Sequence, residues 1–283
     1  MEYAYWLKWQ DTAGVIPSGA RIYLGEECCE RKIPALDLLM SWAWNLKDSG
    51  CNMTLVTPLV SESVLGQLEQ MLDRLSRVFE SYEVVCNDWG VFSLACERPF
   101  CQQVVGRLLA RQDTDPRLAQ ILNYDFQKSQ ERDVRHVDGT IARLTYLPPP
   151  PEYETHLRRP SIITSTVLDY LGRTGAGRLE LNNTLQGLDI TLTSGWKASI
   201  YVPDVLVTMK RHCSICNLAD DEGKDGAIDC SPAYTEWTHP SFPLPLYAKG
   251  NALYYFNQIL PDNCENLDID RIVSRLPEPA SCT

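Results

Sequence analysis

Residues 52–86 read NMTLVTPLVSESVLGQLEQMLDRLSRVFESYEVVC and contain a strand, a helix and a second strand in succession. Asn52–Thr57 is predicted to be the first strand and Tyr82–Cys86 the second. Between them, apolar residues of 64–79 recur at spacings of three and four, which predicts an amphipathic helix with its charged residues on the other side. A helix between two short β-rich runs predicts parallel strands joined by a right-handed crossover.

The same alternation continues on both sides of this unit. Further strands are expected at Ala4–Lys8, Arg21–Gly25, Gln102–Val105, Arg178–Leu181 and Tyr201–Val207, and further helices at 33–44 and Ile163–Leu171. Residues 113–160 interrupt the alternation because they are polar and include four consecutive prolines at 148–151. Such a run is extended and does not fit a helix interior or a central strand. The sequence therefore predicts an α/β fold, a single TIM-like barrel of regular or irregular form over 1–283, with a polar, proline-rich insertion or arm at 113–160 and a cysteine-rich segment at 208–283.

The overall composition argues against several classes of protein. A net charge of −11 with scattered basic residues disfavours nucleic-acid binding, which depends on clustered Lys and Arg. No stretch approaches the roughly 18 apolar residues of a membrane span, and the first residues do not resemble a signal peptide. The chain has 11 cysteines, an odd number. We therefore expect reduced thiols in the cytoplasm, a subset of which binds metal.

The most informative motif is a group of three late cysteines, Cys213, Cys216 and Cys230, with the spacing C-x2-C-x13-C. Two thiolates three residues apart can close on one metal centre, and the third can reach it across a polar loop. A fourth ligand must come from a distant segment. Loops that follow the strands of a parallel barrel meet at one rim, so Cys28 or Cys29, which follow a predicted strand, would lie nearby. The alternatives are a structural zinc site or unrelated buried thiols. Core packing is expected for Cys51, Cys86, Cys96 and Cys101, and Cys264 is a reserve ligand.

Polar residues also follow the other predicted strands, where a barrel would present them to a substrate. The candidate substrate-binding residues are Asn87, Asp88, Arg107, Glu180 and Asn182. Arg107 suits a bidentate contact with a substrate carboxylate, or alternatively a surface salt bridge. Asn and Asp after a strand also form tight turns, so a structural use of these residues stays open.

Three of these segments together resemble a known family. They are YLGEECCERK at Tyr23–Lys32, NDWGV at Asn87–Val91 and the late cysteine group, and they are similar to peptidase family U32, the collagenase-like peptidases. The resemblance covers about residues 3–110 and 178–260 and is to the iron–sulfur branch around the anaerobic ubiquinone-biosynthesis protein. It implies a TIM-barrel-like fold and a [4Fe–4S] cluster, with zinc as the alternative metal. The ligands carried over are Cys29, Cys213, Cys216 and Cys230, where Cys216 replaces a family cysteine that would lie shortly after Cys230. The choice between Cys28 and Cys29 stays open.

The resemblance also implies a function. It indicates an iron–sulfur protein of the oxygen-independent hydroxylase type that acts on a small aromatic or quinone-like molecule, with a paralogous subunit as partner in a heterodimer. The first alternative is a non-catalytic subunit that binds a cluster or zinc and stabilises a catalytic paralogue. A peptidase is the remote alternative, because the sequence contains neither H-E-x-x-H nor G-x-S-x-G.

Overall fold

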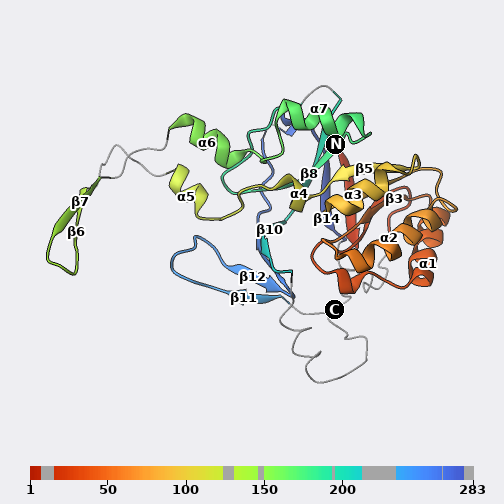
Figure 1. Ribbon diagram of the computed structural model, residues 1–283, viewed down its shortest axis with the longest axis horizontal. Coiled ribbons are helices and arrows are strands. Elements are labelled where there is room, and N and C mark those ends of the chain that lie inside the picture. The colour runs from red at the N-terminus through yellow and green to blue at the C-terminus, as the bar shows by residue number, and fades with distance from the viewer. Residues whose placement is uncertain are drawn as a thin grey trace, which may run out of the picture.

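In the computed structural model the chain forms a closed barrel of parallel strands (Figure 1). Around the barrel the strands are β1 (Glu2–Leu7), β14 (Ile269–Arg275), β9 (Lys197–Tyr201), β8 (Arg178–Asn182), β5 (Cys101–Val105), β4 (Tyr82–Cys86), β3 (Asn52–Val56) and β2 (Arg21–Gly25). The structure describes residues 1–7, 16–123, 131–145, 150–192, 195–211, 234–262 and 264–276. The prediction of a TIM-like α/β barrel is confirmed.

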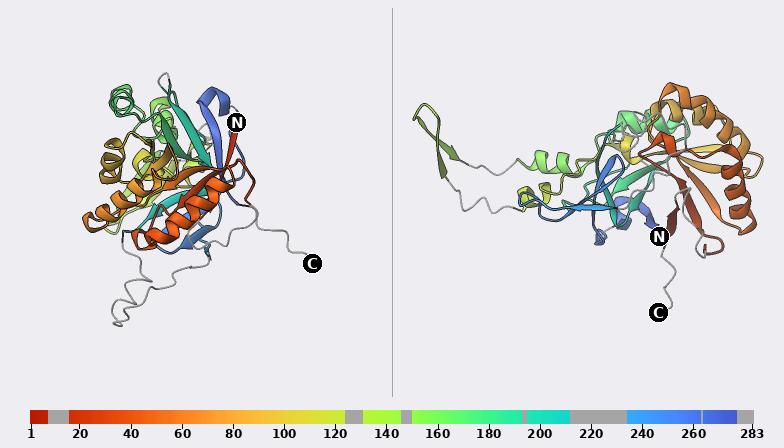
Figure 2. Two further views of the ribbon diagram at one scale, coloured as in Figure 1. Left: turned by 90° about the vertical axis from the view of Figure 1, so that its right-hand side faces the viewer. Right: turned by 90° about the horizontal axis from the view of Figure 1, so that it is seen from below.

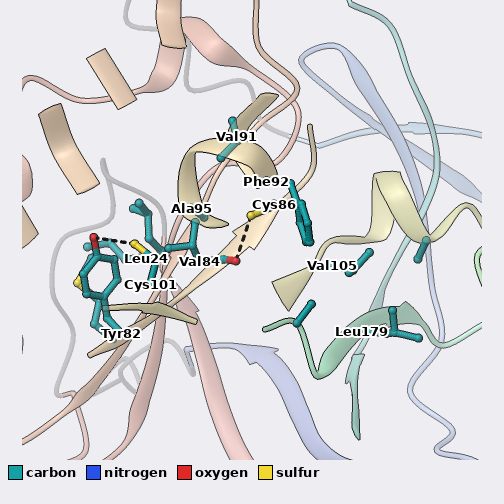
Figure 3. Packing of buried hydrophobic residues seen from close by; sticks show 14 of the residues in the cluster. Leu24, Tyr82, Val84, Cys86, Val91, Phe92, Ala95, Cys101, Val105 and Leu179 are labelled. Carbon is teal, nitrogen blue, oxygen red and sulfur yellow. Dashed lines mark hydrogen bonds between the residues drawn. The ribbon is translucent and has the colours of Figure 1, made fainter. Parts of the chain in front are cut away.

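The outward faces of the strands pack against the helices that connect them. Helices α1 (Leu36–Asp48), α2 (Glu62–Leu75) and α3 (Trp89–Cys96) follow β2, β3 and β4, respectively. Figure 3 shows Val84 and Cys86 of β4 beside Val91 and Ala95 of α3, and all four side chains are buried. Parallel strands covered in this way are apolar on their outer face, which is why the periodicity of the sequence identified them. Of the cysteines expected in the core, Cys51, Cys86 and Cys101 are buried and Cys96 is half-buried.

The interior of the barrel contains charged residues as well as apolar ones. Arg271 donates to both carboxylate oxygens of Glu83, at 2.7 and 2.9 Å, and to the Tyr23 hydroxyl at 2.8 Å. These three side chains come from three different strands and fill the part of the barrel near the amino ends of the strands. The ring of Tyr23 also belongs to an apolar cluster that includes Trp6 and Tyr201. The interior is therefore lined by layers of inward-pointing side chains, as in other small parallel barrels.

The longest connection joins β5 to β8. It contains α4 (Arg107–Ala110), α5 (Leu118–Leu122), the hairpin β6 (Glu131–Arg135) and β7 (Ile141–Thr145), α6 (Pro151–Arg158) and α7 (Ser165–Arg173). The hairpin lies away from the barrel in Figure 1 and in the right-hand view of Figure 2. Pro151 occupies the first turn of α6, where the missing N–H costs no helical hydrogen bond. Among the described helices, none has both the length and the apolar character needed to cross a bilayer.

The prediction of one strand over Tyr201–Val207 is wrong. Strand β9 ends at Tyr201, and Val202 makes a last barrel contact through its N–H to Val273 O at 2.9 Å. Pro203 follows and has no N–H with which to continue the ladder. The chain then enters a separate antiparallel sheet beside the barrel, with the order β10 (Asp204–Met209), β13 (Ala252–Phe256), β12 (Leu246–Lys249) and β11 (Thr235–Trp237). The cysteine segment thus follows a strand of this second sheet and not a barrel strand.

Candidate functional site at the barrel rim

The loops after the barrel strands meet at the carboxyl ends of the strands, where most of the candidate residues lie. Strand β2 ends at Gly25, which has φ +141°. A Cβ on this residue would lie 2.1 Å from the Val56 carbonyl oxygen, so only glycine allows β2 and β3 to approach this closely. Of the residues that follow, Glu27 pairs with Arg107 and Cys28 packs against Leu206 of the second sheet.

A buried ion pair between Arg107 and Glu27 lies at the centre of the rim, and neither side chain has exposed surface. Arg107 Nε donates to Glu27 Oε1 at 3.1 Å, and Arg107 Nη2 donates to Glu27 Oε2. Arg107 Nη1 donates to Asn182 Oδ1 at 3.0 Å and to the Asp204 carbonyl at 2.8 Å. The centroid of the Tyr201 ring lies 3.8 Å from the guanidinium carbon. Burial lowers the pKa of Arg107, but the Glu27 carboxylate more than offsets this, so the guanidinium is held in its charged form.

This geometry differs from the surface salt bridge that was one alternative for Arg107. The pair is fully buried, and protein groups already accept hydrogen bonds from Nε and both terminal nitrogens. A substrate carboxylate would have to displace one of them, so substrate binding by Arg107 stays a prediction. Glu27 was not among the predicted site residues. The signal for it is its position two residues after the strand that ends at Gly25.

Asn87 and Asn182 connect neighbouring rim loops. Asn87 Nδ2 donates to the Thr57 carbonyl at 2.9 Å, and Asn87 Oδ1 accepts from the Leu108 N–H at 3.1 Å. A Cβ at Gly106 would lie 2.2 Å from this Oδ1, so the glycine is required for the contact. Asn182 Oδ1 accepts from the Leu206 N–H at 2.9 Å, which links the rim to the second sheet. Both asparagines are buried and use their amides within the protein.

The other two candidates occupy different places. Asp88 is half-buried and caps α3, since its Oδ1 accepts from the Gly90 N–H at 2.7 Å. Glu180 lies inside the barrel below the rim, with no exposed surface, and accepts from the Tyr23 hydroxyl at 2.9 Å. Burial raises the pKa of Glu180 to about 7, although Arg271 and Arg178 lower it. Contact of either residue with a substrate stays a prediction.

The two adjacent cysteines of the rim have different environments. Cys28 is buried with Leu206 and Ala252, and its Sγ lies 3.5 Å from the Tyr254 hydroxyl. Burial, together with the nearby Glu27 carboxylate, raises the pKa of Cys28 to about 12. Cys29 is only half-buried and precedes a single 3₁₀ turn, η1 (Glu30–Lys32). A metal ligand must be a thiolate, so the environment of Cys28 opposes ligation and Cys29 is the better candidate.

The other three predicted ligands, Cys213, Cys216 and Cys230, lie outside the described residues. Within the described ranges, no group of three His, Cys, Asp or Glu side chains is arranged to hold a metal ion. Cys264 belongs to η2 (Cys264–Leu267), which precedes β14, and its Sγ donates to the Pro261 carbonyl at 3.1 Å. It therefore lies at the opposite end of the barrel from Cys29, which argues against its use as a reserve ligand.

The described residues on either side of 212–233 both lie beside Cys28. Asn251 Nδ2 donates to the Cys28 carbonyl and to the Lys210 carbonyl, and the Lys210 N–H donates to the Asn251 carbonyl at 2.8 Å. At the other end, Tyr234 packs against the cluster that contains Cys28, with its ring centroid 6.1 Å from that of Tyr254. The cysteine segment thus leaves and re-enters the described structure next to the loop that carries Cys29.

Aromatic residues of the second sheet flank this part of the rim and were not predicted as site residues. Tyr247 and Phe256 stack with their centroids 4.3 Å apart, and both are half-buried. The guanidinium of Arg275, at the end of β14, lies 5.0 Å from the Phe256 ring centroid and donates to Asp204 Oδ2 at 2.7 Å. These residues come together because the second sheet packs against the rim residues Cys28 and Asn182, which no local pattern indicates.

The chain has a distant structural likeness to one solved protein described below. No protein-family model matches the sequence, and no curated protein matches it. A solved structure described as "The Structure of the U32 Peptidase Mk0906" is similar over 99% of this chain and 94% of that chain, with a TM-score of 0.40 and 13% identity. A likeness of this degree carries no argument about family membership or activity.

Proposed function

We propose that the chain is an iron–sulfur protein with a [4Fe–4S] cluster at the barrel rim. The ligands would be Cys29, Cys213, Cys216 and Cys230. The observation that carries this proposal is the side chain of Asn251, which donates to the carbonyls of both Cys28 and Lys210. It ties the chain just before the late cysteines to the neighbour of Cys29, as a four-cysteine site requires.

The donor set fits the proposed group. Four thiolates are the usual ligands of a [4Fe–4S] cluster, and they also suit zinc, which stands as the alternative metal. A bound cluster would supply one-electron redox chemistry. Beside it, the Glu27–Arg107 pair adds no net charge and fixes the position of the loop that carries Cys29.

We propose that the reaction is oxygen-independent hydroxylation of a small aromatic or quinone-like molecule. This proposal rests on the family resemblance. The half-buried rings of Tyr247 and Phe256 support an aromatic substrate, because flat rings and the adjacent Arg275 favour stacking. Of the five residues predicted to bind substrate, only Asp88 retains partial exposure. It is the one of the five that a substrate could reach without displacing a side chain.

One observation favours a second candidate, a non-catalytic subunit of a heterodimer with a paralogous protein. Asn87, Arg107 and Asn182 are buried, and protein groups already occupy the hydrogen-bonding positions described for them. Because these polar groups already have protein partners, the rim is better suited to hold a cluster in place than to bind a substrate. A peptidase is the remote third candidate. We also propose a cytoplasmic location, because the many thiols are consistent with reducing conditions.

Iron and sulfide analysis of anaerobically purified protein tests the cluster. We expect a brown protein with about four irons per chain. Cys29→Ser should lose the iron, and the matched variant Cys28→Ser should retain it because the Cys28 thiol faces an apolar cluster. Colourless protein with one equivalent of zinc would contradict the iron–sulfur proposal, and full iron retention in Cys29→Ser would remove Cys29 from the ligand set.

A second experiment distinguishes the enzyme from the subunit. Cluster-loaded chain is incubated with aromatic and quinone-like substrates and a chemical reductant, alone and with a paralogous subunit. Turnover by the chain alone supports the enzyme, and Asp88→Asn should then raise KM. Turnover that appears only with the partner and survives Asp88→Asn supports the subunit.

A further inference from the structure

Two buried oxygen atoms inside the barrel, Glu180 Oε2 and Tyr201 Oη, have no hydrogen-bond partner within the described part of the chain. The side chains belong to residues that are 0% and 1% exposed. They project inward from the adjacent parallel strands β8 and β9, in which Glu180 pairs with Ser199 and Asn182 pairs with Tyr201. Glu180 and Tyr201 are therefore diagonal neighbours on the same face. Buried polar atoms almost always have a partner in the protein or in a bound molecule, so a pair of such atoms indicates a ligand.

The Tyr23 hydroxyl determines what kind of partner is needed. Arg271 Nη1 donates to the Tyr23 oxygen at 2.8 Å, and the Tyr23 O–H donates to Glu180 Oε1 at 2.9 Å. While Tyr23 donates to Oε1 and not to Ser199 Oγ, which lies 3.3 Å from its hydroxyl oxygen, the proton of a protonated Glu180 is on Oε2. Glu180 Oε2–H and Tyr201 O–H are then two donors that need acceptors, whereas ionised Glu180 needs a donor at Oε2. An sp³ oxygen that carries both lone pairs and hydrogens satisfies either state.

The charges around the site indicate a neutral ligand. Arg271 is paired with Glu83 at 2.7 Å, and Arg178 is paired with Asp270 at 2.7 Å. Glu180 has no ion pair within 4.0 Å among the described residues. A cation would need further carboxylates, but those nearby already neutralise arginines. An anion would face an acid that has no counter-ion of its own.

We infer that Glu180 and Tyr201 bind a small neutral protic molecule inside the barrel, with the size and hydrogen-bonding capacity of water. The rest of this layer contains small side chains, including Ala4, Val85 and Val104, together with the rings of Trp6 and Tyr23, which meet the Tyr201 ring edge to face. On its other side, Tyr201 stacks under the Arg107 guanidinium at 3.8 Å. The bound molecule therefore lies one side-chain layer below the rim and gives the buried Glu180 carboxyl a partner in both of its protonation states.

A high-resolution crystal structure of the wild-type protein tests the site. We expect an ordered solvent peak within about 3 Å of both Glu180 Oε2 and Tyr201 Oη. A direct hydrogen bond between the two side chains, or no density beside either atom, would overturn the inference. This result does not depend on whether the chain binds a cluster.

Water oxygen-17 relaxation dispersion provides a second measurement, because it counts long-lived internal water. Tyr201→Phe removes one hydroxyl without changing the ring, and it should lower the count by one. Tyr82→Phe is the matched control, since the Tyr82 hydroxyl donates to the Leu72 carbonyl at 2.6 Å, outside the barrel interior. It should leave the count unchanged. An unchanged count in Tyr201→Phe would overturn the inference.

Discussion

Replacement of Glu180 by glutamine is expected to change how stability depends on pH. Glutamine keeps the shape of the side chain and the oxygen that accepts from the Tyr23 hydroxyl, but it does not titrate. In the wild-type protein, burial raises the pKa of Glu180 from its ordinary value of 4.5 to about 7. The folded state therefore holds this proton more tightly than the unfolded state does.

The size and sign of the effect follow from this difference. Below pH 4.5 the carboxyl is protonated in both states and costs nothing. As the pH rises to about 7, the unfolded state ionises and the folded state does not, so folding becomes less favourable by about 1.4 kcal/mol per pH unit. The total is about 3 kcal/mol, or roughly two orders of magnitude in the unfolding constant. Because Glu180 has no exposed surface, solvent does not screen this cost appreciably.

Urea unfolding from pH 4.5 to 8.5 measures the effect. The free energy of unfolding of the wild type should fall relative to that of Glu180→Gln as the pH rises through this window, and the difference should level off above about 7. Subtraction of the two curves removes the contribution of all other carboxylates. Glu236→Gln, at an exposed position of β11, controls for the loss of one negative charge. A difference between wild type and Glu180→Gln that stays constant with pH would refute the reasoning.

Three further substitutions test the structural account of the rim. Arg107→Met should lower the free energy of unfolding by about 3–5 kcal/mol in urea titrations because it leaves the Glu27 carboxylate buried and unpaired, and adding Glu27→Met should recover much of this loss. If the single and double variants are equally unstable, the charge explanation is wrong. Gly25→Ala places a Cβ 2.1 Å from the Val56 carbonyl oxygen at φ +141°, so it should cost more than about 2 kcal/mol, and an unchanged melting temperature would contradict the stated need for glycine. Asp88→Ala should cost about 1 kcal/mol through loss of the α3 cap, measured by thermal unfolding, and no change would show that the cap is dispensable.

Local periodicity in the sequence was sufficient to predict the strands and helices in the part of the barrel where helices cover the strands. The strand predicted at Asn52–Thr57 is found at Asn52–Val56, and the helix predicted at 64–79 is found at Glu62–Leu75. These elements were identifiable because one face of each is apolar and meets another apolar face. Strand β14 (Ile269–Arg275) was missed because Asp270, Arg271 and Arg275 break up its apolar pattern. In the closed barrel, Arg271 and Arg275 take part in ion pairs with residues of other elements.

The sequence alone also placed Cys28 and Cys29 at the end of a strand, but it did not distinguish them. The second sheet does so, since Leu206 and Ala252 surround the Cys28 thiol and leave Cys29 half-buried. That sheet was not predicted, because it begins where Pro203 ends a run of residues that reads as one continuous strand.

The chemistry of the rim depended on tertiary structure most of all. Glu27 and Arg107 are 80 positions apart, and no local pattern indicates that they form a pair without exposed surface. The raised pKa of Glu180 also has no local signal in the sequence, because it results from burial of the carboxyl when the barrel closes around it. Hydrophobic periodicity acts over a few residues and can be read along the chain, whereas burial of charge depends on which distant strands become neighbours. For that reason the sequence determined the type of fold and the positions of its first strands, and only the closed barrel decided which polar residues are paired, buried or available.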